Sequence, residues 1–125
     1  MSYTTRTPQK TIGVNRSVWT VRFRPDTAAN PTYIQGKAAF SVVHTATGQW
    51  TVTFRDAAYK VVGHSCGVSL ATPAAAHMSV TFANEGTNTA LTALVSHFTT
   101  ALADIASDAN NWISLTVEVE NSRAG

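Results

Sequence analysis

The side chains that could carry catalytic or metal-binding chemistry are few in this chain and lie far apart. Its histidines are His44, His64, His77 and His97. None of them pairs with another at metal-ligand spacing, and none has an acidic neighbour in the sequence. Two ligands from one segment of a zinc site typically have about two to five residues between them. The sequence therefore predicts no metal site, unless the fold itself assembles a histidine cluster.

Cys66 is the single cysteine, so no internal disulfide can form, and synthesis in a reducing cytoplasm is expected. A nucleophilic cysteine needs a base and a polar, partly exposed setting. Strand alternation instead places Cys66 on one face with Val62, His64, Val68 and Leu70. We therefore expect a structural thiol, and beside it a buried, neutral and hydrogen-bonded His64.

Two segments match ligand-binding motifs only in part. Residues 104–111 offer Asp and Asn oxygens for calcium, but they lack the spacing of a calcium loop, which favours a turn. Residues 63–67 include two glycines, but no lysine follows them and no helix start is visible, so a phosphate-binding loop is not indicated. We expect no enzyme activity and no cofactor.

The elements that would position any site are strands, and the clearest pair is a hairpin over residues 37–56. Trp50, Val52 and Phe54 alternate with threonines, which puts three large apolar groups on one face of a strand. The preceding segment alternates in the same way. Gly48 lies in the connection, where a short hairpin often needs the positive φ that glycine adopts easily.

The same alternation recurs along the chain. Further strands, bounded by turns rich in Gly, Pro and Asn, are expected at 18–24, 59–70, 78–82 and 112–120. Residues 89–106 have the apolar spacing of a helix. Their threonines are poor helix formers, which favours a strand near 94–100 followed by a loop, with a helix as the alternative.

These strands predict an all-β fold, a single-domain, jelly-roll-like antiparallel β-sandwich over residues 18–122. Residues 1–17 hold too few apolar groups to fold alone, which predicts an extended N-terminal arm. Residues 123–125 would form a short C-terminal tail. No run of apolar residues is long enough to cross a membrane, and none resembles a signal peptide.

Charged residues make up 13% of the 125 residues, about half of the usual ~25%. This fits hydroxyl-rich surface strands, and it equally fits a surface that is partly hidden in an oligomer. The net charge of +2 does not indicate a nucleic-acid binder. All charged residues before Asp26 are basic, and most charged residues after residue 84 are acidic. Unless this clustering is fortuitous, it suggests an arm that seeks an acidic partner or the acidic part of a neighbouring copy.

Small residues occupy one face of the strand expected at 59–70, namely Gly63, Ser65, Gly67 and Ser69. Glycine in a strand often marks a place where another backbone approaches closely. We therefore expect this face to form an oligomer interface.

Three segments carry a resemblance to a known family. They are Gly36 with Phe40-Ser-Val-Val and Thr47-Gly-Gln-Trp-Thr-Val-Thr-Phe54, then Ala57-Ala-Tyr-Lys-Val-Val62, and finally Ile113-Ser-Leu-Thr-Val-Glu-Val-Glu-Asn-Ser122. In these segments, which together span roughly residues 18–122, the chain resembles the small jelly-roll virion proteins of tailed bacteriophages, of the capsid decoration and head-fibre type.

The resemblance implies a homotrimer that binds the major capsid protein on the outside of the shell and stabilises the virion. It would be synthesised in the host cytoplasm, and no nucleic-acid or membrane partner is expected. The arm would dock through charge steering and small apolar anchors, for which the candidates are Tyr3, Arg6, Lys10, Ile12 and Arg16. One alternative is a tail or fibre head domain that binds a host receptor or glycan through aromatics such as Tyr33 or Trp112. Another is an enzyme or small-ligand binder on a sandwich scaffold.

Overall fold

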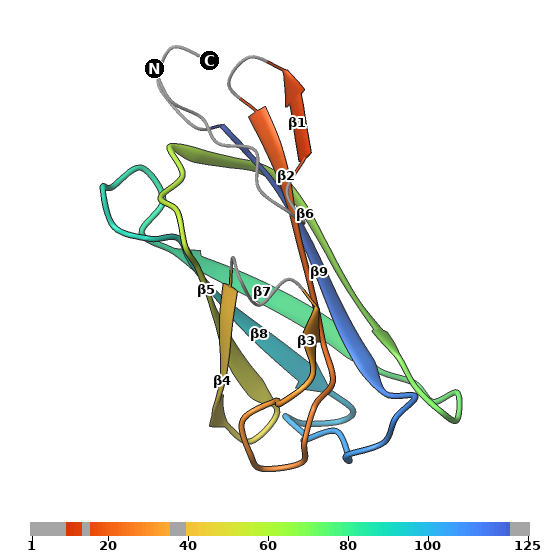
Figure 1. The fold of residues 1–125 in the computed structure, drawn as a ribbon. Helices are drawn as coiled ribbons and strands as arrows, with labels where there is room; N and C mark the ends of the chain where they lie inside the picture. The colour runs from red at the N-terminus through yellow and green to blue at the C-terminus, as the bar shows by residue number, and fades with distance from the viewer. Residues whose placement is uncertain (1–9, 14–15, 36–39, 121–125) are drawn as a thin grey trace.

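The computed structural model describes residues 10–13, 16–35 and 40–120 of the chain. These residues form two antiparallel sheets that pack face to face as a β-sandwich (Figure 1), and none of them is helical. The predicted all-β fold is therefore confirmed.

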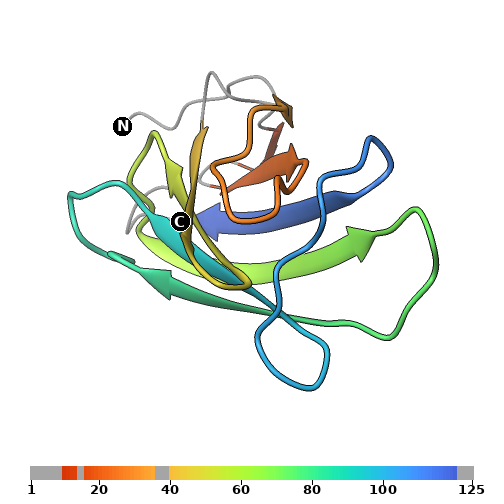
Figure 2. The same cartoon turned by 90° about the horizontal axis from the view of Figure 1, so that it is seen from below.

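The first sheet has the strand order β1-β2-β9-β6, and a short β3 also pairs with β2. Its strands are β1 (Lys10–Gly13), β2 (Arg16–Phe23), β3 (Ile34–Gln35), β6 (Lys60–Ser69) and β9 (Trp112–Glu120). The second sheet has the order β4-β5-β8-β7. Its strands are β4 (Phe40–Ala46), β5 (Gln49–Phe54), β7 (His77–Ala83) and β8 (Thr92–Phe98). The chain passes repeatedly between the two layers (Figure 2), so that β2 and β9, from opposite ends of the chain, are neighbours.

The core lies between the sheets and is built by the period-2 pattern of the strands. Every second residue of β9, from Ile113 to Val119, is completely buried, while its neighbours are half-buried on the outer face. Aromatic rings join the two layers: the ring centroid of Phe54 in β5 lies 5.2 Å from that of Trp19 in β2 and 5.0 Å from that of Phe40 in β4. Burying each such side chain contributes about 1.5–3 kcal/mol, which makes this cluster a major source of stability.

The segment of ambiguous pattern, 89–106, contains strand β8 and no helix. The expected strand is confirmed, with its start two residues earlier. Val95 and Ile105, which both fit a helical spacing, are buried for different reasons. Val95 points inward from β8, whereas Ile105 fills the core from the loop that follows, so tertiary packing rather than a helix produced the spacing.

The described part of the expected N-terminal arm belongs to the first sheet. Strand β1 pairs antiparallel with β2, with Lys10 opposite Val18, and β2 itself begins at Arg16. Residues 1–9 lie outside the described residues. The sandwich therefore includes residues that the sequence analysis assigned to the arm.

Candidate functional site

The arm residues proposed for docking fall in different places. Tyr3 and Arg6 lie outside the described residues, and Lys10 and Ile12 belong to β1. Arg16, at the start of β2, forms ion pairs with two carboxylates of the neighbouring strand β9, at 3.4 Å to Glu118 and 3.3 Å to Glu120.

These ion pairs bring the basic first part of the chain against its acidic last strand. The side chain of Arg16 is 47% exposed, and exposed ion pairs contribute only about 0–1 kcal/mol. Arg16 therefore has carboxylate partners within its own chain, and sequence reasoning, which looked for them in another molecule, did not find this pairing.

The small residues proposed for the oligomer interface lie together on the outer face of β6. Their neighbours on β9 are in register, with Ser65 opposite Thr116 and Gly67 opposite Ser114. A methyl group added at Gly67 would meet nothing within 4 Å. The structure thus places these residues on one accessible strip, and another backbone could approach it closely.

The inner face of β6 differs from the prediction at two positions. A bulge between Val61 and Gly63 leaves Val62 36% exposed. His64 points toward the second sheet but is exposed, and its ring meets the Phe82 ring edge-on at 5.2 Å. The expected burial of His64 is wrong, because β6 is an edge strand and the sandwich does not close over it.

Cys66 lies further along the same face and is half-buried. Burial raises the pKa of its thiol to about 11. At neutral pH the reactive thiolate is therefore only about one part in ten thousand. This chemistry suits a packing residue rather than a nucleophile.

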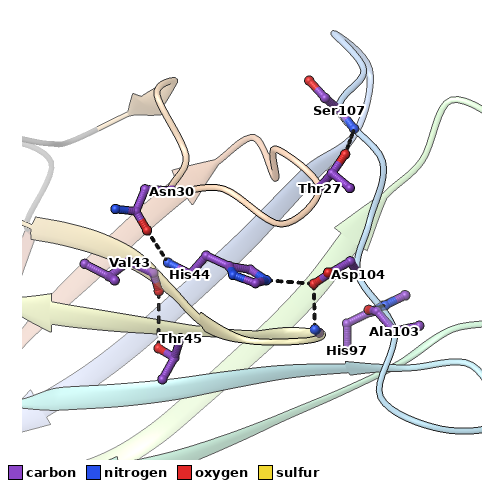
Figure 3. Close-up of polar contacts among 10 residues, drawn as sticks. Thr27, Asn30, Val43, His44, Thr45, His97, Ala103, Asp104 and Ser107 are labelled. Atoms are coloured by element: carbon purple, nitrogen blue, oxygen red, sulfur yellow. Dashed lines mark hydrogen bonds and ion pairs between the residues drawn. The ribbon is translucent and has the colours of Figure 1, made fainter.

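A partly buried carboxylate joins the β4–β5 hairpin to a distant loop (Figure 3). Asp104 Oδ1 accepts hydrogen bonds from His44 Nε2 at 2.8 Å and from the N–H of Gly48 at 2.7 Å. The expected positive φ of Gly48 is confirmed at 69°. The C=O of Gly48 in turn accepts the N–H of His97 at 2.8 Å. The hairpin turn is therefore held to the loop by the Asp104 side chain and to β8 by a backbone hydrogen bond.

The contacts around His44, Gly48 and Asp104 indicate that this corner of the sandwich stabilises the fold. The His44 ring packs edge-on against Trp50 at 5.9 Å, and the N–H of His44 donates to Asn30 Oδ1 at 2.9 Å. Burial alone would raise the pKa of Asp104, but the hydrogen bonds from Gly48 and His44 outweigh it and lower the pKa below its ordinary value of 3.8. The carboxylate is thus ionised at neutral pH, and its Oδ1 atom bonds to two groups of its own chain.

Sequence reasoning missed this corner, because His44 and Asp104 are 60 positions apart. It assigned residues 104–111 to a turn. At Asp108 the turn chemistry is confirmed: its Oδ1 accepts the N–H of Asn110 at 2.8 Å, and its C=O accepts the N–H of Asn111 at 3.1 Å. Asp104 and Asn111 instead bond to distant segments, and Asn111 Oδ1 accepts the N–H of Ala71 at 2.8 Å.

We expect Asp104→Asn to lower the free energy of unfolding by about 1.5 kcal/mol at neutral pH, because charge-assisted hydrogen bonds are lost. The folded pKa lies below the unfolded one, so this contribution is present above about pH 4 and disappears as the pH falls through the lowered pKa. Urea unfolding at neutral and acidic pH measures it. Wild type should lose more stability on acidification than the variant does. Asp108→Asn is the matched control, and an identical pH dependence of Asp104→Asn and wild type would contradict the assignment.

Two arginines, one in β2 and one just after it, stack on aromatic rings. The guanidinium of Arg24 lies 3.7 Å from the ring centroid of Tyr33, and that of Arg22 lies 4.7 Å from the ring centroid of Trp112. Tyr33 is 56% exposed. Each such contact stabilises an exposed site by about 0.5–1 kcal/mol. These pairs combine aromatic faces with positive charge, which is the chemistry that the receptor-binding alternative requires.

The strands of the two sheets differ sharply in charge. Strands β4, β5, β7 and β8 contain no Asp, Glu, Lys or Arg. In the first sheet, β2, β6 and β9 contain Arg16, Arg22, Lys60, Glu118 and Glu120. One layer of the sandwich is thus charged, and the other presents serine and threonine hydroxyls without ions.

Within the described ranges, no three His, Cys, Asp or Glu side chains are grouped so that they could hold a metal ion. The same part of the chain contains no helix long and apolar enough to span a membrane. No family model, curated protein or solved structure matches the chain.

Proposed function

We propose that this protein is a bacteriophage capsid decoration protein, which binds the major capsid protein on the outside of the shell as a homotrimer and stabilises the virion. It would act on the virion surface after synthesis in the host cytoplasm, as a binding protein rather than an enzyme. The proposal is supported by the β-sandwich fold together with the resemblance of the hairpin and the last strand to small virion proteins.

The observation that carries the proposal is the unequal distribution of charge over the sandwich. A decoration protein needs one surface for its own copies and another for the shell. Depletion of charge is typical of the buried centres of interfaces, and charged surfaces steer the encounter with a larger partner. Strand β7, at the edge of the charge-free second sheet, fits contact between copies, and the charged strands β2 and β9 of the first sheet fit contact with the shell.

The hypothesis that the N-terminal segment docks on the capsid can be tested by reversing the charge of one of its basic residues. We expect Arg6→Glu, made in the full chain, to weaken binding to shells that lack the protein by about tenfold or more. Three arms on one trimer bind cooperatively because later contacts are effectively intramolecular, so a change in each arm is amplified. Co-sedimentation with purified shells over a range of protein concentrations measures the dissociation constant.

Arg55→Glu is the matched control, because Arg55 is exposed and follows β5. It makes the same charge reversal outside the N-terminal segment. If Arg6→Glu and Arg55→Glu bind shells equally well, the N-terminal segment does not dock on the capsid.

A second candidate function is a tail or fibre head domain that binds a host receptor or glycan. The exposed Tyr33 with Arg24 favours it, because an aromatic face beside a cation can bind a sugar ring and an acidic group. Glycan-array binding that is lost in Tyr33→Ala, together with no binding to shells, would select this function over the first.

A further inference from the structure

One side of the sandwich, formed by β6, β7 and the chain between them, is free of charged residues. No Asp, Glu, Lys or Arg occurs from residue 61 to residue 84, and Glu85 is the single one between residues 61 and 103. The carboxylate of Glu85 accepts a hydrogen bond from the N–H of Val61, at the beginning of β6. We call the surface of residues 61–83 the β6–β7 side.

Both strands of this side are the outermost strands of their sheets. In the described residues β6 pairs with β9 and β7 pairs with β8, and each leaves its other edge without a strand partner (Figures 1 and 2). Proteins normally protect such edges with lysines, prolines or inward-pointing charges, since an open edge can pair with another chain. Apart from Lys60 at its first position, β6 has none of these, and β7 has none at all.

The core is incomplete along the same side. Cys66, Val68 and Leu70 of the first sheet face Met78, Val80 and Phe82 of the second, and all of them are only partly buried. By contrast, Leu115 and Val117 in the adjacent β9 are completely buried. A groove of about 490 Å³ opens between Val68, Leu70 and Met78. The partly buried apolar side chains would be stabilised if a partner removed them from water.

We propose that the β6–β7 side is the surface by which copies of this chain associate with one another. Identical neutral surfaces of three copies can meet around a common axis without opposing like charges, whereas a strongly charged partner would find no counter-charge on them. The small exposed residues Ser65, Gly67 and Ser69 border this side and allow close approach of the neighbouring copy.

The dimensions also fit an interface. A ten-residue strand is about 33 Å long, and the sheets of a sandwich lie about 10 Å apart. With the flanking side chains this amounts to several hundred Å², a substantial part of the ~800 Å² that each partner contributes to a standard interface. The inference rests on the self-association contained in the proposed function. Its test measures self-association and not binding to shells, so a failure here leaves binding to shells open.

The test uses three serine-to-lysine variants of the full chain. Ser69 in β6 and Ser79 in β7 are exposed on strands of the proposed interface, and Ser41 is exposed on β4, at the other edge of the second sheet. Light scattering coupled to size exclusion gives the mass of each at micromolar concentration. Wild type and Ser41→Lys should have the mass of a trimer, three times 13.3 kDa. Ser69→Lys and Ser79→Lys should weaken association about 100-fold or more, because like charges then face each other.

A monomeric wild type would overturn the inference, and would indicate that this side is covered by residues 1–9 of the same chain or serves another protein. An oligomer that survives both Ser69→Lys and Ser79→Lys would overturn it too. Circular dichroism shows whether the variants are folded. A second measurement needs no variant: alkylation of Cys66 at alkaline pH should slow as the wild-type concentration rises, and a rate independent of concentration contradicts the interface.

Discussion

Gly48→Ala is expected to lower the free energy of unfolding by about 3 kcal/mol, because Gly48 has a positive φ and lies against another backbone. Its φ is 69°, where residues other than glycine are strained by about 1–2 kcal/mol. A Cβ atom here would lie 2.6 Å from the N of Ala103 and 2.9 Å from its O. These are backbone atoms that cannot rotate away, so the loop must move and the adjacent bond from Gly48 to Asp104 must lengthen.

Thermal and urea unfolding measure this change. The melting temperature should fall by roughly 10 °C for a domain of this size. Gly67→Ala is the matched control, since its added methyl group meets nothing within 4 Å and its φ is not positive. It should stay within about 1 kcal/mol of wild type. Equal stabilities for the two variants would show that the hairpin does not press against the loop at Ala103.

Phe54→Ala is expected to cost about 3–5 kcal/mol, because the ring is completely buried and removal leaves a cavity between the sheets. The Phe54 ring contacts both Trp19 and Phe40, so its removal breaks one aromatic contact to the other sheet and one within its own sheet. Phe98→Ala is the matched control, because it removes a partly exposed ring at the end of β8.

Urea unfolding of both variants tests whether the core is centred at Phe54. Phe98→Ala should cost clearly less, in proportion to the smaller area it buries. A loss at Phe98 equal to or larger than that at Phe54 would mean that the centre of the core lies elsewhere.

The strands could be predicted from the sequence because their signal is local. In β5 and β9, alternate residues are apolar, and the same residues are buried in the structure. The hairpin turn was equally local, since Gly48 supplies the required φ within the segment itself. A two-residue period fixes which side of a strand faces the core, whatever lies beyond the strand.

The features that could not be predicted depend on contacts between distant segments. Asp104 contacts His44, which is 60 positions away in the sequence, and Arg16 contacts Glu118, which is 102 positions away. The exposure of His64 follows from the position of β6 at the edge of its sheet, which alternation within β6 does not reveal. The pairing of β1 with β2 likewise needs a neighbouring strand, so a polar segment without a core of its own was assigned to an arm.

We propose that this sandwich binds to the outside of a phage shell, and an electron-microscopy map of virions purified from cells that produce the protein tests this most directly. The account predicts density for the two-layered sandwich on the outer surface of the head, at symmetry-related positions, with the β6–β7 sides of neighbouring copies in contact. Density for the sandwich only at the tail or fibre tips, or a head surface without it, would contradict the account.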